Sequence, residues 1–382
     1  MESQRQYIPV LEYLQMSGRA GRPKYDNYEE SIAIANAQKS KEEIEETYLH
    51  GEPEVIYSKL AAEPVLRTYI LSLIATGFTP TKNKLSDFFS KTLWAHHYGD
   101  MWQLEKIINK MLDLLEEWEF INIEGNKDFS SANEDNILKA TKLGKRVAEL
   151  YLDPLTANYF ITCLQTATST NTEPFSYLQM ISHTLELRPL LRVRVKNQDM
   201  IDAALVMYDD NLLEDYSTYE FMYDEYSEFL NSVKTGLFFN DWINENNEEI
   251  LLEKFDIRPG EISMKKNRAD WLLYTCSELS KLLGFHALLK DIQKLRLRLK
   301  YGAKEELLPL LKFKNIGQVR ARKLYNNDIK NVASVKRADF MNLSQLLGHN
   351  VSIGIKKQVG QDFSKLKVKP TKRKGQLSLN KY

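Results

Sequence analysis

The chain has 382 residues, of which 43% are hydrophobic and 27% charged, as is typical of globular domains that bury their own cores. No stretch approaches the roughly 18 consecutive apolar residues of a membrane span, and residues 1–6 lack the apolar core of a signal peptide. The two cysteines, Cys163 and Cys276, exclude a disulfide framework and a cysteine-based zinc site. We therefore expect a cytoplasmic protein of two to four domains with no membrane partner.

Charge is distributed unevenly along the chain, although the formal net charge is zero. Residues 301–382 carry 18 Lys and Arg against 5 Asp and Glu, a net charge of +13. The first 300 residues carry 34 against 47, a net charge of −13. A basic end on an acidic body predicts a polyanion partner at the C-terminal end.

The first motif lies near the N-terminus, in residues 15–23. A helix over residues 10–20 would bring Arg19 and Arg22 to nearly the same side, three positions apart. Paired guanidinium groups suit a triphosphate that gains charge during hydrolysis. The spacing resembles motif VI (Q-x-x-G-R-x-G-R) of superfamily-two helicases, whose positions are matched here by Gln15, Gly18, Arg19, Gly21 and Arg22.

That resemblance implies that Arg19 and Arg22 are arginine fingers, that Gln15 helps to position the cleft, and that Gly18 belongs to the ATP-binding set. No G-x-x-x-x-G-K-[ST] sequence occurs, and no acidic magnesium-binding box precedes Gln15. We therefore expect no ATP hydrolysis by this chain alone, and ATP and Mg²⁺ binding only together with an upstream ATPase half.

Residues 1–55 are predicted to be the C-terminal remnant of a RecA-like α/β domain. Ser31–Ala35 has the pattern of a short buried strand, the last of that sheet, and Lys39–Leu49 that of a charged surface helix. Without upstream strands to pair with, some backbone hydrogen-bonding groups of this segment should lack partners.

Residues 56–149 are predicted to form a winged helix of three helices followed by a β-hairpin. Its helices are expected near 65–76, around Leu85 and over 102–118, and its strands at 120–123 and 137–141. Such a domain binds nucleic acid or acts as a structural bracket. The pair His96 and His97 lacks carboxylate or cysteine partners at ligand spacing, so we expect no metal there.

Residues 150–300 are predicted to be a helical bundle that begins with Asp153 as N-cap and Pro154 at the first helical position. Between Asp209 and Asp256 there are 14 acidic residues against two lysines, and such a face should lie outside. Five tyrosines near helical spacing are expected in the core: Tyr208, Tyr216, Tyr219, Tyr223 and Tyr226.

A helix predicted over 259–284 has a wide apolar stripe from Ile262 to Leu283. Beside that stripe lie Met264, Arg268, Trp271 and Thr275. A tryptophan next to an arginine on a half-exposed face suits stacking on unpaired bases while a phosphate is held, but it equally suits helix packing.

Residues 301–366 show a helix-hairpin-helix pattern around Gly317. Backbone N–H groups at a helix N-terminus can bind a DNA phosphate, and the nearby cations Arg320, Arg322 and Lys323 would add salt-sensitive attraction. A weaker second copy is centred on Gly348 and Gly354.

The basic tail, residues 367–382, ends in a possible sliding-clamp peptide. Gln376, Leu379 and Tyr382 follow at intervals of three. A short turn would place Leu379 and Tyr382 on one side as apolar anchors. The usual peptide ends in two aromatic residues, whereas only one is present here.

In this order, these elements resemble the archaeal Ski-type DNA repair helicases, relatives of HelQ and of the polymerase-theta helicase domain. The resemblance implies a mainly α fold and a 3′-to-5′ ATP-dependent DNA helicase that acts on single-stranded or forked DNA in repair and replication restart. It also implies a ratchet bundle in which Trp271 stacks on bases. Met264 stands where the family often has arginine, so the phosphate contact falls to Arg268, Lys265 or neither.

Three interpretations follow. The chain is a fragment or split-gene product that needs an ATPase half, or a stand-alone DNA-binding adaptor without catalysis. The third is an RNA helicase of the same branch, but those enzymes usually carry an additional arch domain that is not found here.

Overall fold

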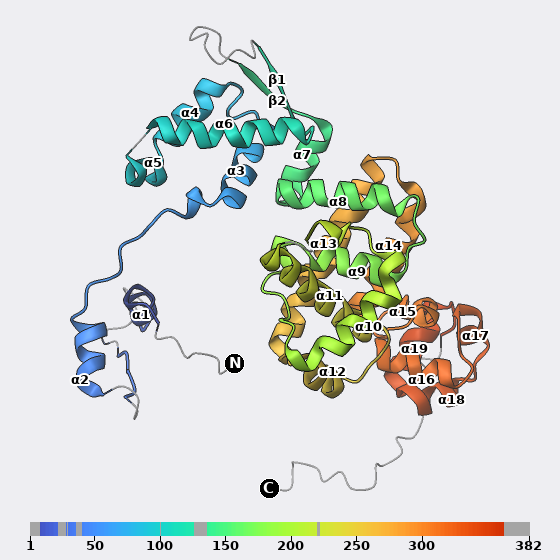
Figure 1. Ribbon diagram of the computed structural model, residues 1–382. Helices are drawn as coiled ribbons and strands as arrows, with labels where there is room; N and C mark the ends of the chain where they lie inside the picture. The colour runs from blue at the N-terminus through green and yellow to red at the C-terminus, as the bar shows by residue number, and fades with distance from the viewer. Residues whose placement is uncertain are drawn as a thin grey trace.

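The structure, a computed structural model, describes residues 8–21, 28, 30–35, 40–99, 101–125, 136–219 and 222–362. Over these residues the fold is mainly α, as predicted, with one two-stranded antiparallel sheet (Figure 1). The strands are β1 (Ile121–Glu124) and β2 (Ile137–Ala140), with Ile121 opposite Ala140.

The N-terminal part consists of α1 (Val10–Ser17), α2 (Lys41–Ile44) and a π-helical turn, η1 (Glu45–Leu49). The predicted strand over 31–35 is wrong, because this segment is extended but unpaired, with Ile32 76% and Ile34 85% exposed. A strand needs a neighbour for its backbone groups, and the described residues provide none beside it. Figure 1 shows α1 and α2 lying apart from the rest of the described chain, to which residues 51–58 connect them.

The next unit begins with the short η2 (Lys59–Ala61) and carries its hairpin after four helices: α3 (Glu63–Ala75), α4 (Lys82–Ser90), α5 (Leu93–Tyr98) and α6 (Met101–Glu117). Helix α5, which Thr92 caps by accepting from the Ala95 amide, is not predicted from the sequence. Helix α7 (Lys142–Glu149) follows the hairpin in sequence. Its Gly144 packs so tightly against the residue before β1 that a Cβ there would lie 1.9 Å from the Phe120 carbonyl oxygen.

The bundle is built around the long helix α13 (Pro259–Leu282), and α14 (His286–Tyr301) returns along it. The Asp153 carboxylate accepts from the Leu155 amide with Pro154 at the first helical position, which confirms the predicted start of α8. The other helices are α8 (Pro154–Ala167), α9 (Pro174–Ser182), α10 (Gln198–Tyr208), α11 (Tyr223–Ile243) and α12 (Glu248–Phe255). Four 3₁₀ turns join them: η3 (Leu185–Leu187), η4 (Val195–Asn197), η5 (Asp209–Asn211) and η6 (Tyr216–Tyr219).

One continuous hydrophobic core joins α3–α7 to the bundle, from Leu66 to Leu299. Four of the five tyrosines predicted to be buried pack against a smaller cluster around Phe229, but Tyr223 is 88% exposed. Tyr223 starts α11, so it has no preceding turn to pack against.

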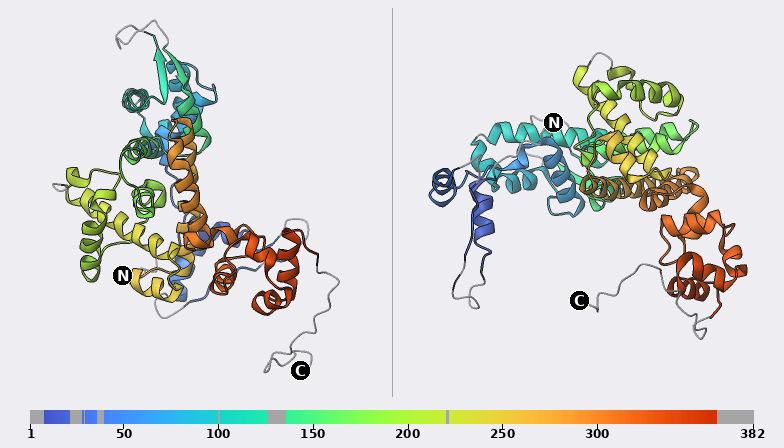
Figure 2. Two further views of the ribbon diagram at one scale, coloured as in Figure 1. Left: turned by 90° about the vertical axis from the view of Figure 1, so that its right-hand side faces the viewer. Right: turned by 90° about the horizontal axis from the view of Figure 1, so that it is seen from below.

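The terminal unit has a separate core that extends from Ala303 to Ile355. It consists of η7 (Glu305–Leu307), α15 (Leu308–Leu311), α16 (Gln318–Asn326), α17 (Val332–Arg337), α18 (Phe340–Leu347) and α19 (His349–Gln358). Figure 2 shows it projecting from the end of α14. Its separate core lets it move as a body unless specific contacts hold it to the bundle.

Candidate nucleic-acid interface

The N-terminus of α16 has the geometry of a phosphate site. Gly317 is the exposed N-cap residue, no side chain caps the helix, and a Cβ at Gly317 would meet no atom within 4 Å. Arg320 and Lys323 are exposed on the same helix. Arg320 Nη1 donates to the Asn315 carbonyl 2.8 Å away, which places this guanidinium beside the loop that enters the helix. Open N–H groups flanked by cations attract anions.

Arg322, predicted to join them, faces the protein instead. Its guanidinium donates through Nε and Nη2 to the two carboxylate oxygens of Glu245, each 2.7 Å away, and through Nη1 to Glu306 at 2.7 Å. These carboxylates raise the pKa of Arg322 further above its already high range. The structure therefore brings Gly317, Arg320 and Lys323 together and separates Arg322 from them.

On α13, the apolar stripe is buried as predicted from Ile262 to Leu279, whereas Leu283 lies just past the helix end and is half-buried. Trp271 beside the stripe is half-buried against the main core. Met264 is 37% exposed. Arg268 donates through Nη1 to the Arg188 carbonyl at 2.6 Å and to the Glu186 carbonyl at 3.2 Å. The helix therefore offers a partly open tryptophan beside an arginine that is already held by the chain around η3.

Lys265 lies deeper on the same helix and is only 2% exposed. Its ammonium donates to the Pro189 carbonyl, and burial lowers its pKa to about 8. A contact between this ammonium and a phosphate would require the chain around Pro189 to move. Of the cations predicted on this face, Arg268 is the more accessible.

The motif-VI residues are at the surface. Gln15 is exposed on α1, and Gly18 and Arg19 are exposed in the turn that follows. Helix α1 ends at Ser17, three residues earlier than predicted. Arg19 therefore lies outside the helix, and the prediction that helical geometry brings Arg19 and Arg22 to the same side is wrong for Arg19. Arg22 lies outside the described residues, as do Gln376, Leu379 and Tyr382 of the predicted clamp peptide.

The carboxylate of Glu54, more than 40 residues further along the chain, anchors the N-terminal end of α1. It accepts from the amides of Val10 at 2.7 Å and Leu11 at 3.0 Å, and these bonds lower its pKa. The Tyr48 hydroxyl donates to the Ile8 carbonyl at 2.8 Å. Helix α1 is thus held by its N-terminal end, and motif VI extends from the opposite end.

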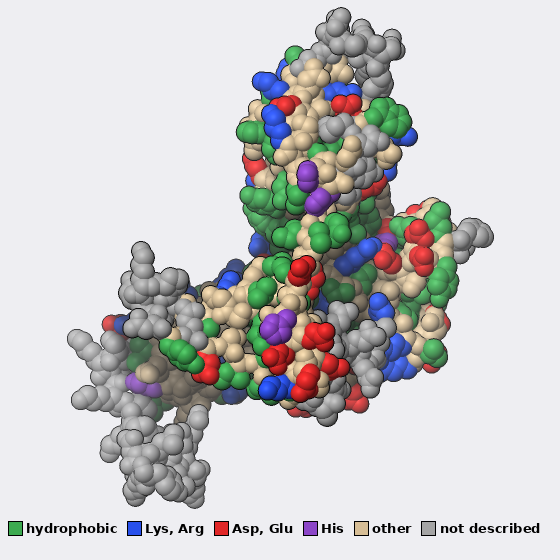
Figure 3. All heavy atoms as spheres, turned by 90° about the vertical axis from the view of Figure 1, so that its left-hand side faces the viewer, with side chains coloured by type: hydrophobic (Ala, Val, Ile, Leu, Met, Phe, Trp, Pro, Cys, Tyr) green, Lys and Arg blue, Asp and Glu red, His purple; other side chains and the backbone are tan. Residues whose placement is uncertain are grey.

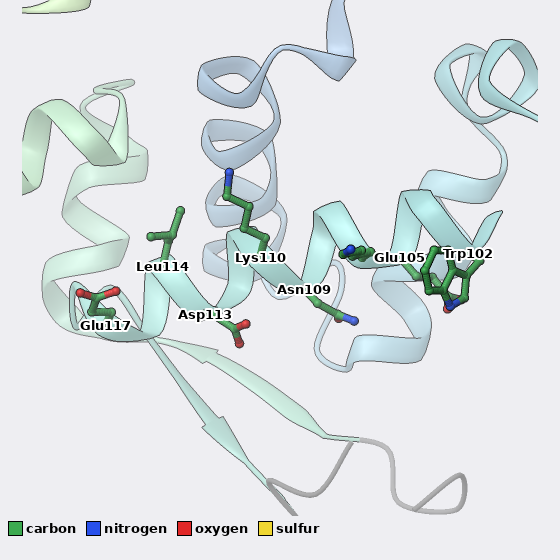
Figure 4. Close-up of a pocket in the computed structure, with 8 residues that line it drawn as sticks. Trp102, Glu105, Asn109, Lys110, Asp113, Leu114 and Glu117 are labelled. Atoms are coloured by element: carbon green, nitrogen blue, oxygen red, sulfur yellow. The ribbon is translucent and has the colours of Figure 1, made fainter. Parts of the chain in front are cut away.

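An open groove of about 600 Å³ runs along α6 (Figure 4). The exposed Trp102 lies at one end and Glu117 at the other. The groove is lined by three carboxylates, those of Glu105, Asp113 and Glu117, and by two ammonium groups, those of Lys106 and Lys110. This charge balance repels phosphates and argues against α6 as a helix that lies on a DNA backbone.

The face shown in Figure 3 has acidic and basic side chains interspersed, without a continuous basic track. On α5, His96 and His97 have ring centroids 5.8 Å apart. Among the described residues, no group of three His, Cys, Asp or Glu side chains could hold a metal ion, and no helix is long and apolar enough to cross a bilayer.

Two features of the structure are not predicted from the sequence. One is an exposed basic segment after η3, beside a groove of about 900 Å³: Arg188, Arg192, Arg194 and Lys196. The alternation of these cations with apolar residues is a sequence signal that could have revealed the segment. Arg188 pairs with Glu228, and Arg194 pairs with Asp256. The other feature is Glu245, which nothing in the sequence distinguishes from its acidic neighbours.

Comparison with known proteins explains this set of elements. Residues 175–302, which span α9 to α14, match the family described as archaeal helicase, domain 4, and residues 30–122 match a helix-turn-helix domain family. The chain is 37% identical over 374 residues to the ATP-dependent DNA helicase Hel308 of Thermococcus kodakarensis, covering 97% of the chain and 32% of that protein. It is 36% identical over 373 residues to Hel308 of Pyrococcus horikoshii, covering 97% of the chain and 49% of that protein.

The chain is similar over nearly its whole length to the C-terminal region of Ski-type superfamily-two helicases. It spans between about a third and a half of the length of these two Hel308 relatives. Trp271 and Arg268 lie on α13 within the matched helicase domain 4, whereas Gly317, Arg320 and Lys323 lie beyond it. The helix-turn-helix match ends within β1.

Proposed function

We propose that this chain is the DNA-engaging part of an ATP-dependent 3′-to-5′ DNA helicase that acts in DNA repair and restart of stalled forks. The observation that carries the proposal is similarity to Hel308 helicases over nearly the whole chain. The exposed N-terminus of α16 with Arg320 and Lys323, and Trp271 on the long helix α13, support it.

In this proposal, motif VI acts on ATP that a RecA-like ATPase half binds together with Mg²⁺. Arg19 and Arg22 stabilise charge on the transferred phosphoryl group, and Gln15 and Gly18 complete that side of the cleft. The exposed apolar side chains of the N-terminal part, including Ile32, Ile34 and Val55, favour a missing partner surface over a stand-alone adaptor.

The test is single-stranded DNA binding by the purified chain over a range of salt concentrations. Affinity should fall steeply with salt, and Arg320→Ala or Lys323→Ala should each lower the slope by roughly one unit. Lys41→Ala, which removes an exposed cation on α2, is the matched control and should leave the slope unchanged. Absence of DNA binding, or equal effects of all three variants, would contradict the proposal.

A sliding clamp is a further proposed partner, through Gln376, Leu379 and Tyr382 in the C-terminal tail. Titration of a labelled peptide of residues 367–382 with the clamp should give micromolar binding that Leu379→Ala or Tyr382→Ala abolishes. No binding at about 100 μM, equivalent to about −5.5 kcal/mol, would exclude this partner.

A further inference from the structure

The terminal unit meets the bundle at a small polar joint in which one side chain has an unusual number of partners. Glu245 follows the end of α11, and its carboxylate is only 10% exposed. It accepts two bonds from the Arg322 guanidinium at 2.7 Å, one from the Lys304 amide at 2.9 Å, and one from the Gln318 side chain at 3.4 Å. All three partners lie beyond residue 302, whereas Glu245 belongs to the bundle.

The backbone holds Glu245 in place for this role. Its φ of +67° lies in the left-handed region, which is uncommon for a residue other than glycine. The Glu245 amide donates to the Trp242 carbonyl at 3.2 Å, and the Trp242 indole donates to the Leu299 carbonyl at 2.7 Å. The end of α11 is thus fixed to the end of α14, and Glu245 points across the gap to the terminal unit.

The chain leaving α14 is equally constrained. Gly302 has a φ of +62°, and a Cβ there would lie 2.7 Å from the Trp242 ring. Arg298, 8% exposed, donates to the carbonyls of Ala303 at 3.3 Å and Ile243 at 3.4 Å. Lys294 on α14 pairs with Glu305 at 2.6 Å.

The ion pair also meets the conditions under which a partly buried pair is strong. The contact between Arg322 and Glu245 is bidentate, and the third guanidinium nitrogen of Arg322 donates to Glu306. Burial alone would raise the pKa of Glu245, but the bonds from Arg322 and the Lys304 amide lower it, so the carboxylate remains charged. These bonds span 77 residues of sequence and join two separate hydrophobic cores.

We propose that Glu245 and Arg322 form an interdomain clasp that sets the orientation of the terminal unit on the bundle. Arg322 is then a positioning residue for the DNA-binding surface of α16, and Arg320 and Lys323 on the same helix contact the phosphates. The clasp itself follows from the contacts above. Only its consequence for DNA rests on the proposed function.

The decisive measurement is the distance between the bundle and the terminal unit in the full chain, obtained with paired spin labels. Cysteines introduced at the exposed Val206 on α10 and Met341 on α18 carry the labels, and the native Cys163 and Cys276 are buried. Arg322→Ala and Glu245→Gln should each broaden the distance distribution at least twofold. Arg320→Ala, the matched control on the same helix, should leave it unchanged.

Arg322→Lys distinguishes a clasp from a phosphate contact. Lysine keeps the charge that a phosphate needs, but it cannot reproduce the fork that binds both oxygens of Glu245. We expect Arg322→Lys to broaden the distribution as Arg322→Ala does. An unchanged distribution in Glu245→Gln and Arg322→Lys would overturn the proposal, and circular dichroism of each variant confirms that it is folded.

DNA binding gives a second, independent readout. Arg320→Ala should lower the salt slope by roughly one unit, whereas Arg322→Ala should weaken binding with the slope nearly unchanged. A slope lowered by one unit in Arg322→Ala, with an unchanged distance distribution, would identify a phosphate contact and overturn the clasp. Because the distance measurement needs no DNA, failure of the proposed DNA binding alone leaves the test of the clasp intact.

Discussion

At the scale of single residues, identical side-chain chemistry serves different ends in this chain. Arg320 and Arg322 are two positions apart on α16, yet one is exposed and the other is held by Glu245 and Glu306. Lys265 and Arg268 are three positions apart on α13, and both donate to carbonyls around η3. A cation in a DNA-binding motif is therefore not by itself a phosphate contact.

Trp271 is predicted to stack on an unpaired base. Trp271→Ala should weaken single-stranded DNA binding by about 1–3 kcal/mol, since base stacking on an aromatic ring is worth that much. Fluorescence titration well below the melting temperature measures this effect, with Trp102→Ala on the acidic face of α6 as control. A lower melting temperature with unchanged affinity would show that Trp271 serves only in packing.

Lys265 should make stability depend on pH. Burial lowers its pKa to about 8, against 10.5 for an ordinary lysine, so between these values the unfolded chain binds more protons than the folded chain. The free energy of unfolding should therefore rise with pH across this window, relative to Lys265→Met. Urea denaturation at pH 7.5 and 9.5 compares the two proteins, and Lys196→Met, at an exposed site, should not change the pH dependence.

At the scale of elements, a buried ion pair connects α3 to the start of the bundle. Arg67, 5% exposed, donates through Nε and Nη2 to the Asp153 carboxylate at 2.5 and 2.8 Å. The same carboxylate caps α8, and the Asp153 amide donates to Glu186 at 3.1 Å. Asp153 thus fixes a helix start and an interhelical contact through its side chain, and the approach of η3 through its backbone amide.

Arg67→Met should destabilise the chain by about 3–5 kcal/mol, because it leaves a buried carboxylate without its partner. Chemical denaturation monitored by circular dichroism measures this loss. The control, Lys91→Met, breaks an exposed pair with Asp87 and should cost less than about 1 kcal/mol. Similar losses in the two variants would mean that the interior pair is not a structural link.

At the scale of the whole molecule, the N-terminal part differs from the rest. Helices α3 to α14 pack around one large core and the smaller cluster at Phe229, and the terminal unit has its own core, whereas α1 and α2 contribute to none of these. Ile32 and Ile34 are exposed in the unpaired segment, and in the proposed helicase they would lie against the ATPase half. The motif-VI residues Gln15, Gly18 and Arg19 belong to the same N-terminal part.

We expect no ATP hydrolysis by the purified chain, and DNA-stimulated hydrolysis after addition of a RecA-like ATPase half. Arg22→Ala or Arg19→Ala should lower the restored rate by roughly 10³–10⁵-fold, the effect of losing an arginine finger in other phosphoryl-transfer enzymes. A coupled phosphate-release assay measures both steps. Robust hydrolysis by the chain alone would contradict the prediction, and Lys41→Ala serves as a control for charge.

The sequence by itself determined the features that depend on near neighbours. Apolar periodicity predicted the long helices, including α6 within one residue and α13 within two residues at either end, and Asp153-Pro154 predicted the start of α8. The buried stripe of α13 and the glycine N-cap of α16 follow from the same local rules. These rules act over three or four residues, so the order of residues is sufficient to apply them.

Only the tertiary structure decided which polar groups face solvent and which face the protein. Arg322 bonds Glu245, 77 residues away, and Lys265 bonds Pro189, 76 residues away, so no local pattern distinguishes these cations from Arg320. The segment 31–35 has the composition of a strand but has no strand beside it among the described residues. Burial and pairing depend on what packing brings together, and for these residues that is set by contacts distant in sequence.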